Sequence, residues 1–396
     1  MVEAAPDLVV ELTGFRAFGA RTLLQVADGV RYFSNEYWTA RQRQAHSLHE
    51  VSYRACFKPQ LPAFFIDRLT VPGDVVYDPF MGRGTTPVEA ALRGRIPFGS
   101  DINPLSRALV EPRINPPALA EIEARLRQIP WAAFTRFERQ ELLVFYHPET
   151  LARIEGLRSW LRKRKQAGTL DQVDRFLRMV AINRLTGHSP GFFSVYTLPP
   201  NQALSIESQR RINARRRQTP EARDVPALLL RKARSLLSTG PARADRTLLL
   251  TARSDHIPEI ADGAVALTVT SPPFLDIVDY EADNWLRCWF LGVEAKQVPI
   301  TRHRSIERWQ AFIHATLAEL ARVTRPGGHI AFEVGEVRNG RVQLEQQVIA
   351  AAHGLPLETL GVMVNRQDFT KTANCWGVAN NRGGTNSNRI VLLRKG

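Results

Sequence analysis

The chain contains a predicted strand, a glycine-rich loop, a helix and a second strand in immediate succession, and this order most constrains its fold. Val75-Val76-Tyr77 has the apolar pattern of a buried strand. Thr86–Leu92 has the spacing of a helix, which Gly94 ends, and Pro97–Asp101 has the pattern of the next strand. A β-loop-α-β unit of this kind opens a doubly wound sheet, so we expect a Rossmann-like α/β fold.

The loop between that first strand and the helix is Asp78-Pro79-Phe80-Met81-Gly82-Arg83-Gly84-Thr85-Thr86. Glycine lets the backbone approach a ligand closely, and the helix that follows presents free N–H groups. Pro87 replaces the third glycine of a dinucleotide fingerprint, and the absence of Gly-Lys-Ser/Thr excludes a P-loop. Asp101 ends the second strand, where an acidic side chain binds ribose hydroxyls or caps a helix. The loop therefore predicts a cofactor that contains a nucleoside.

Strand patterns return late in the chain, after a long helical stretch. Residues 118–180 have helical spacing, and so does Ile306–Val323 near the C-terminus. A sheet domain interrupted by a helical insertion is the organisation that this order predicts. The other predicted elements are strands at Leu8–Leu12, Thr22–Val26, Thr247–Leu250, Ala264–Val269, His329–Val334 and Arg389–Leu393, and helices at Leu61–Leu69 and Leu228–Leu237.

Positive charge is concentrated in this insertion. The net charge is +14, and residues 116–245 carry 23 Lys/Arg against 12 Asp/Glu, which leaves only +3 elsewhere. A concentrated basic field favours a polyanionic partner such as nucleic acid; an arginine-rich surface from a GC-rich genome is the alternative. We expect an N-terminal segment at 1–45, a sheet domain at 46–115 and 246–396, and a basic helical insertion at 116–245.

The glycine loop also resembles a motif of a known family. Asp-Pro-Phe-x-Gly-x-Gly-Thr-Thr is a hallmark of the DNA amino-methyltransferases, and Asp101-Ile102-Asn103-Pro104 resembles their next motif. Residues 46–49 and 57–62 resemble the family's segment that closes over the methionine end of the cofactor. The resemblance implies a Rossmann-like methyltransferase domain that uses S-adenosylmethionine. It implies cofactor contacts from Phe57, Lys58, Pro59, Asp78, Phe80, Gly82, Gly84, Thr85, Asp101 and Asp255, with plain core packing the alternative for Phe57.

A second motif, Thr270-Ser271-Pro272-Pro273-Phe274, follows a predicted buried strand and suits chemistry at an exocyclic amine. The lone pair of such an amine is delocalised into the base, so acceptors aimed at its N–H hydrogens would favour the transition state. Ser271 offers a hydroxyl, Pro272 a carbonyl in a stiff backbone, and Phe274 a face for an extruded base. The candidate catalytic residues are Ser271, Pro272, Pro273 and Phe274; a turn without chemistry is the alternative.

The first residue of this tetrapeptide suggests which base is methylated. In the DNA amino-methyltransferases aspartate there favours adenine-N6 enzymes and serine favours cytosine-N4 enzymes, so Ser271 resembles the cytosine-N4 type. We expect a site-specific DNA methyltransferase acting on N4 of a flipped-out cytosine. The alternatives are adenine-N6 methylation, an RNA amino-methyltransferase, and a non-catalytic DNA-binding protein with a vestigial cofactor site. Cytosine-C5 chemistry is disfavoured because Cys56, Cys288 and Cys375 do not follow proline.

The basic insertion lies between the two motifs, in the position of a target-recognition region in this family. Its arginines are candidates for phosphate contacts, which position a protein on DNA without reading sequence. Asn201 and Gln202 have side chains that suit bidentate contacts to adenine. For any single arginine the alternative is a solvated helix face, and Phe192, Phe193 and Tyr196 belong either to a DNA-contacting loop or to a local core. The candidate DNA-binding residues are Asn201, Gln202, Arg210, Arg211, Arg215, Arg216 and Arg217.

The expected partner is double-stranded DNA, with a cognate restriction endonuclease as a second candidate. No apolar run reaches the roughly 18 residues of a membrane span, and the N-terminus does not resemble a signal peptide. The three cysteines are far apart and fit neither a disulfide framework nor a zinc site. We therefore expect a reducing bacterial or archaeal cytoplasm, close to the nucleoid, with no membrane partner and no metal.

Overall fold

The computed structural model describes residues 7–38, 45–54, 56–198, 202–273, 280–300, 305–337, 342–366 and 387–396. Three residues singled out in the sequence, Asn201, Phe274 and Cys375, lie outside this described part of the chain.

One sheet of nine strands runs through the molecule in the order β1-β2-β10-β11-β7-β6-β3-β4-β5. Strands β3 to β7 are parallel, with β3 between β4 and β6, whereas β11 is antiparallel to both β7 and β10. The direction of strand order reverses between β3 and β6, which is the switch point where ligands bind in open α/β sheets. The strands are β1 Leu23–Ala27, β2 Val30–Asn35, β3 Val75–Asp78, β4 Ile96–Asp101, β5 Leu248–Thr251, β6 Val265–Thr270, β7 Thr324–Val334, β10 Leu357–Arg366 and β11 Ser387–Lys395, and a separate pair is β8 Glu336–Val337 with β9 Val342–Gln343.

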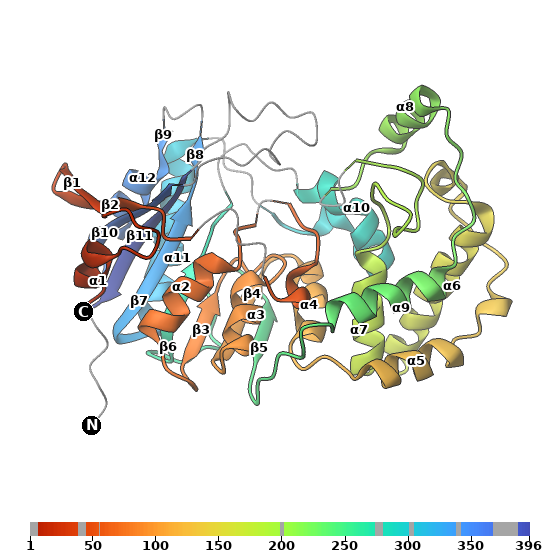
Figure 1. Cartoon of the computed structure of the whole chain (residues 1–396), viewed down its shortest axis with the longest axis horizontal. Helices are drawn as coiled ribbons and strands as arrows, with labels where there is room; N and C mark the ends of the chain where they lie inside the picture. The colour runs from red at the N-terminus through yellow and green to blue at the C-terminus, as the bar shows by residue number, and fades with distance from the viewer. Residues whose placement is uncertain are drawn as a thin grey trace.

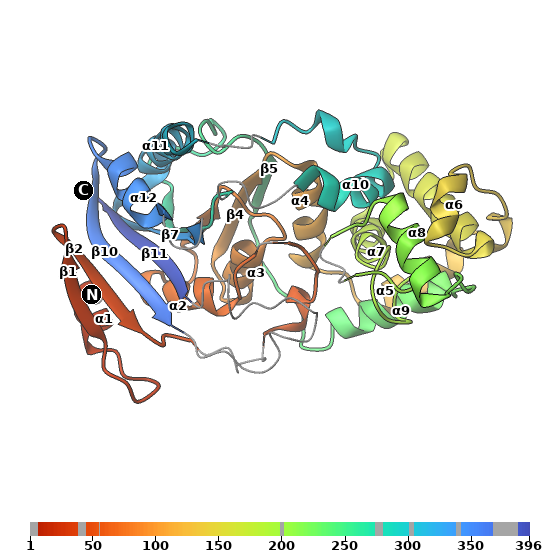
Figure 2. The same ribbon diagram turned by 90° about the horizontal axis from the view of Figure 1, so that it is seen from above.

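Helices cover both faces of the sheet, with α2 and α3 on one side and α11 and α12 on the other (Figures 1 and 2). The alternation of side chains along β3 shows why: Val76 belongs to the apolar cluster of Phe65 on α2, whereas Tyr77 belongs to that of Leu317 on α11. The doubly wound α/β fold expected from the sequence is therefore confirmed. These helices are α2 Gln60–Leu69, α3 Thr85–Leu92, α11 Ile306–Val323 and α12 Leu344–Ala352.

A helical lobe, consisting of α5 to α9 together with α10, stands beyond the β5 end of the sheet (Figure 1). Its core is one apolar cluster to which Leu157 of α6, Phe176 of α7 and Leu229 of α9 contribute. Leu286 and Phe290 of α10 join the same cluster, although α10 follows the second motif in the chain. The expected helical insertion is thus present. The helices are α4 Pro104–Val110 beside the sheet, and in the lobe α5 Leu119–Gln128, α6 Pro148–Gln166, α7 Gln172–Ile182, α8 Ile206–Arg216, α9 Val225–Leu236 and α10 Tyr280–Leu291.

The strand predicted at Leu8–Leu12 is wrong, because this segment begins helix α1, Leu8–Gly14. Asp7 caps the helix by accepting the Val9 N–H at 2.9 Å, and the buried residues Leu8 and Leu12 are four positions apart, as on one helix face. The strand β1 therefore pairs with β2, not with the N-terminal segment. Helices α4 and α12 and strands β2, β8, β9 and β10 were not predicted.

Candidate active site

A pocket opens at the carboxyl ends of β3, β4, β5 and β6, at the switch point of the sheet. The structure thereby brings the glycine loop and the second motif together. Among the described residues predicted to bind the cofactor or to act in catalysis, four do not line this pocket: Lys58, Pro59, Gly84 and Pro272. Those that do are Phe57, Asp78, Phe80, Gly82, Thr85, Asp101, Asp255, Ser271 and Pro273.

The two glycines of the loop differ in what surrounds them. Both have positive φ, +47° at Gly82 and +78° at Gly84. A Cβ on Gly82 would meet the Tyr53 ring at 3.6 Å, an ordinary contact, whereas one on Gly84 would lie 2.3 Å from a methyl of Val110. Gly82 therefore keeps the loop open toward the pocket, and Gly84 allows α3 to begin against α4.

Asp78 lines the pocket and is buried, with an exposure of 1%. Its Oδ1 accepts the Phe80 N–H at 3.0 Å and the Thr270 hydroxyl at 2.6 Å. Burial raises the pKa of Asp78 to about 7, and these hydrogen bonds only partly oppose that effect. The side chain can therefore change its charge near neutral pH.

Two further carboxylates line the pocket in different electrostatic settings. Asp101 accepts the backbone N–H groups of Gly82 at 2.9 Å and Asn103 at 2.8 Å, and burial raises its pKa. The cap of helix α4 is Asn103, so Asp101 is not the helix cap. Asp255 forms a two-pronged ion pair with Arg253 at 2.9 and 2.5 Å, and this arginine lowers the pKa of Asp255.

The second motif is held by residues that the sequence did not single out. The indole of Trp309, a buried residue of α11, donates to the Pro273 carbonyl at 2.9 Å. The Ser271 hydroxyl is hydrogen-bonded to Glu333 on β7, and Asn388 donates to Glu333 Oε1 at 3.0 Å. Burial raises the pKa of Glu333, which the Ser271 hydrogen bond partly opposes. In the sequence, Glu333 is the single acidic residue of the predicted strand His329–Val334, and this pattern could have identified it as a functional residue.

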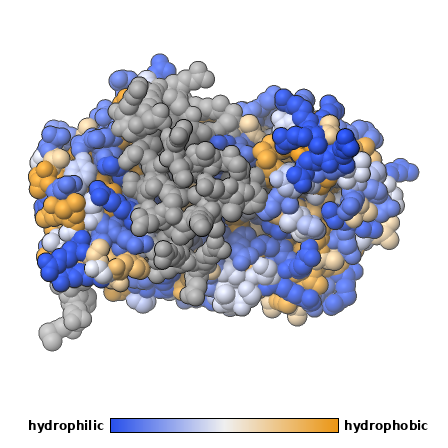
Figure 3. Space-filling model, turned by 45° about the horizontal axis from the view of Figure 1, so that its top comes forward, coloured by the Kyte–Doolittle hydropathy of each residue, from blue (hydrophilic) through white to orange (hydrophobic). Residues whose placement is uncertain are grey.

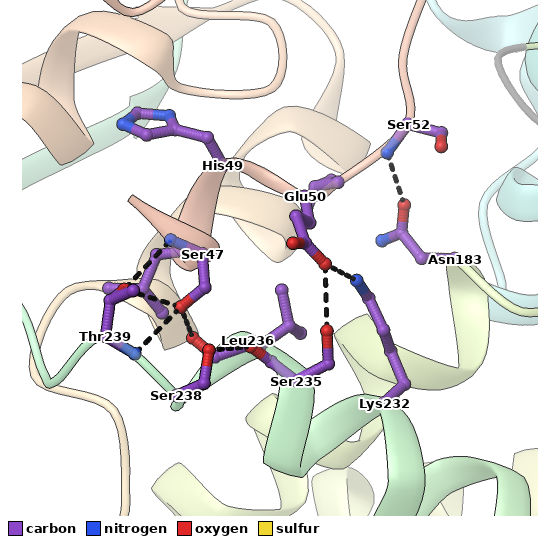
Figure 4. Close-up of polar contacts among 12 residues, drawn as sticks. Ser47, His49, Glu50, Ser52, Asn183, Lys232, Ser235, Leu236, Ser238 and Thr239 are labelled. Carbon is purple, nitrogen blue, oxygen red and sulfur yellow. Dashed lines mark hydrogen bonds and ion pairs between the residues drawn. The ribbon is translucent and has the colours of Figure 1, made fainter. Parts of the chain in front are cut away.

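The segment 46–54, here called the strap, contacts the helical lobe (Figure 4), and its residue Tyr53 lines the pocket. Glu50 points toward α9, where Lys232 and Ser235 donate to its carboxylate at 2.7 and 2.9 Å. The Ser52 N–H donates to the Asn183 side chain at 3.1 Å. Tyr53 at the end of the strap, and Cys56 and Phe57 just after it, form a wall of the pocket.

The predicted DNA-binding arginines gather on α8, away from the lobe core. Gln209 and Ile212 form the buried face of this helix, and Figure 3 shows a strongly hydrophilic patch where α8 lies. Arg216 stacks over the Tyr196 ring at 3.8 Å, and Arg217 has φ +48° where the helix ends. The exposed arginines are Arg210, Arg211, Arg215, Arg216 and Arg217, and the structure records no ion pair for them among the described residues.

The loop before α8 folds into the lobe. Phe192 and Phe193 are buried, with exposures of 5% and 1%, so the local-core interpretation applies to them. The Gln202 side chain accepts from Arg54 at 3.1 Å, and Arg54 also pairs with Asp283 of α10. Gln202 therefore lies where the strap meets the lobe, eight positions before Arg210, the first of the predicted arginines.

The described part of the chain holds no group of three or more His, Cys, Asp and Glu side chains arranged for a metal ion. None of the helices in the described ranges is both long and apolar enough to cross a membrane.

Comparison with known proteins gives partial matches. The model of a DNA methylase family, N6_N4_Mtase, matches residues 27–109. Type II methyltransferase M.BsoBI of Geobacillus stearothermophilus is 22% identical over 311 residues, which is 69% of this chain and 58% of that protein. Type II methyltransferase M.MjaII of Methanocaldococcus jannaschii is 36% identical over 74 residues, 19% of this chain and 14% of that protein.

Among solved structures, TrmN from Thermus thermophilus is similar with a TM-score of 0.33 and 13% identity, covering 86% of this chain and 50% of that one. The chain thus spans less than two thirds of the length of these relatives. The matched family model is described as DNA methylase, and both sequence relatives are named as type II methyltransferases.

Proposed function

We propose that this protein is a site-specific DNA methyltransferase that transfers a methyl group from S-adenosylmethionine to N4 of a flipped-out cytosine. The observation that carries the proposal is the 2.6 Å hydrogen bond from Thr270 to Asp78, because it joins the glycine loop to the second motif within one pocket. Cofactor and substrate motifs that share a pocket suit a direct transfer, with no covalent enzyme intermediate.

The pocket residues suit the chemical groups of S-adenosylmethionine. When bound, this cofactor supplies an electrophilic methyl group on a sulfonium. An ionised Asp78 would balance a positive charge in the pocket. Asp101 suits ribose hydroxyls at the end of β4, Asp255 suits the adenine side, and Phe57 and Phe80 supply apolar walls.

The contact between Ser271 and Glu333 suggests how the amine is activated. A hydroxyl that donates to a carboxylate keeps its oxygen lone pairs free to accept. In this role Ser271 would accept an N–H hydrogen of the exocyclic amine, which concentrates electron density on nitrogen as its lone pair attacks the methyl carbon. The 2.9 Å hydrogen bond from Trp309 would hold the motif still during this step.

Double-stranded DNA is the proposed partner, with the exposed arginines of α8 as phosphate contacts. These arginines lie on the helical lobe, with α10 between α8 and the sheet (Figure 1). The names of the type II relatives make a cognate restriction endonuclease a further proposed partner.

Nucleoside mass spectrometry tests this proposal directly. The protein is incubated with unmethylated double-stranded DNA and S-adenosylmethionine that carries an isotopically labelled methyl group. Labelled N4-methylcytosine is the expected product. Labelled N6-methyladenine would show that adenine, and not cytosine, is the substrate base. Label found only in structured RNA would indicate an RNA enzyme. Tight binding of cofactor and DNA with no labelled nucleoside would indicate a non-catalytic binding protein.

A further inference from the structure

Arg83, the residue between the two glycines of the loop, donates hydrogen bonds to the pocket wall, and within the described ranges it pairs with no carboxylate. Its Nη1 donates to the carbonyls of His49 at 3.4 Å and Val51 at 3.1 Å, and its Nη2 donates to the Phe57 carbonyl at 3.4 Å. Its Nε donates to the Thr85 hydroxyl at 3.3 Å. One side chain therefore joins the glycine loop to both ends of the wall that carries Tyr53, Cys56 and Phe57.

A second arginine, Arg113, donates a hydrogen bond to the main chain of Arg83. Arg113 is fully buried, at 0% exposure, and donates to the carbonyls of Leu109 at 2.8 Å, Leu48 at 3.0 Å and Arg83 itself. Burial and then the nearby charge of Arg83 lower the pKa of Arg113 to about 9. Among the described residues neither arginine has an ion pair, so both charges are compensated by main-chain carbonyls.

Placing a guanidinium charge among main-chain carbonyls costs more desolvation free energy than placing a neutral hydrogen-bonding group there would. A buried cation loses its hydration, and carbonyl dipoles restore that loss only when several are aimed at it. A guanidinium has five donors in a rigid fork, so it can hold several carbonyls in fixed relative positions, which a lysine or an amide cannot. The geometry therefore fixes the main chain at residues 48–51 and at Phe57 against the glycine loop.

We propose that Arg83 is a positioning residue for the cofactor, which fixes the wall formed by Tyr53, Cys56 and Phe57 at its distance from the glycine loop. The inference rests on the proposed function, because it takes S-adenosylmethionine as the occupant of the pocket. Arg83 also lines the pocket itself, and its hydrogen bonds to the wall are the contacts that assign it this positioning role. Its loss should therefore weaken cofactor binding and leave the methyl-transfer step itself intact.

The test compares Arg83→Gln with Arg107→Gln, an exposed α4 arginine that pairs with Glu111. We expect the dissociation constant for S-adenosylmethionine, measured by calorimetry, to rise about tenfold in Arg83→Gln, or about 1.4 kcal/mol. KM for the cofactor should rise similarly, while kcat at saturating cofactor stays within about twofold. Arg83→Lys should recover part of the affinity, and Arg107→Gln should match wild type.

Amide hydrogen exchange of residues 46–57 provides a readout that does not require activity. Exchange there should accelerate in Arg83→Gln while β3 and β6 stay protected. Unchanged exchange, or an unchanged dissociation constant with faster exchange, would overturn the role of Arg83. Lys232→Met removes the ion pair between Glu50 and α9 and leaves the Ser235 hydrogen bond to Glu50 in place. It should weaken cofactor binding less than Arg83→Gln does, and an equal loss would overturn the specific role of Arg83. If the wild-type protein binds no S-adenosylmethionine, the proposed function fails instead.

Discussion

The Thr270 hydroxyl donates a hydrogen bond of 2.6 Å to Asp78 Oδ1, across 192 positions of the chain. A second threonine makes the reciprocal connection, since the Thr86 hydroxyl at the start of α3 donates to the Val269 carbonyl at 2.9 Å. The last residue of β3 and the last of β6 are thus fixed to each other at the switch point. The relative position of cofactor motif and catalytic motif is set by these two buried contacts.

Cofactor affinity should depend on pH through Asp78. Burial raises the pKa of this carboxyl to about 7 in the folded protein, so its ionised form becomes dominant only above neutrality. A cationic cofactor favours the ionised form, and affinity should improve about tenfold between pH 6 and pH 8, then level off. Calorimetric titration with S-adenosylmethionine at five pH values measures this, and Asp78→Asn should show weak, pH-independent binding.

The same raised pKa makes a prediction for stability without cofactor. The folded state holds the Asp78 proton more tightly than the unfolded state, so this contribution is present at low pH and is lost as pH rises from about 4 through about 7. Asp78→Asn retains an oxygen that can accept from Phe80 and Thr270. The unfolding free energy of wild type should therefore fall relative to Asp78→Asn over that window. If the difference in unfolding free energy between wild type and Asp78→Asn stays constant over this pH window, Asp78 is already ionised at the lower end of the window in the folded protein.

Ser271→Ala should reduce turnover by a factor of about 10² to 10³, the usual loss when one preorganised polar contact to the transition state is removed. Binding of cofactor and DNA should remain within about twofold of wild type. Glu333→Gln should cost less, about tenfold in kcat, because the amide still accepts from Ser271 but without a full negative charge. Single-turnover methylation assays separate these effects from product release. Wild-type single-turnover rates in Ser271→Ala would remove the hydroxyl from the mechanism.

The arginines of α8 should contribute to the salt dependence of DNA binding. Arg210→Gln/Arg215→Gln removes two exposed charges from the helix without touching its buried face at Gln209 and Ile212. If both meet phosphates, the slope of log affinity against log salt should decrease in magnitude by about 1.8. The control Arg325→Gln/Arg394→Gln removes the same charge from residues paired with Asp74 and Glu358 on the sheet domain. Equal slopes in the two double variants would exclude α8 from the DNA interface.

Gly84→Ala should destabilise the protein much more than Gly82→Ala. Both substitutions put alanine at positive φ, which costs roughly 1–2 kcal/mol, but only the Gly84 methyl also overlaps Val110, which adds about 1–3 kcal/mol. Urea denaturation of the two variants gives the difference. In a double-mutant cycle Val110→Ala should restore part of the loss in Gly84→Ala, and strict additivity would contradict the steric explanation.

The sequence predicted much of the sheet domain because local patterns encode it. Val75–Asp78 and Ile96–Asp101 are short apolar strands on either side of a glycine loop, and no long-range information is needed to recognise them. The N-terminal prediction was wrong because five apolar and polar residues fit a strand and a helix turn almost equally well, and only burial of Leu8 with Leu12 selects the helix. Strand β10 was not predicted, since its position depends on pairing with β11 and β2.

By itself the sequence determined the residue types of the candidate site: a glycine loop, acids at the ends of strands, and a Ser-Pro-Pro-Phe corner in a chain with a basic insertion. Only the tertiary structure decided which of them meet. It placed Asp78 beside Thr270 and Ser271 beside Glu333, and it aimed Arg83 at three carbonyls of the pocket wall. Such contacts join strands and loops far apart in the chain, and strand order and burial create them, so no local pattern can encode them.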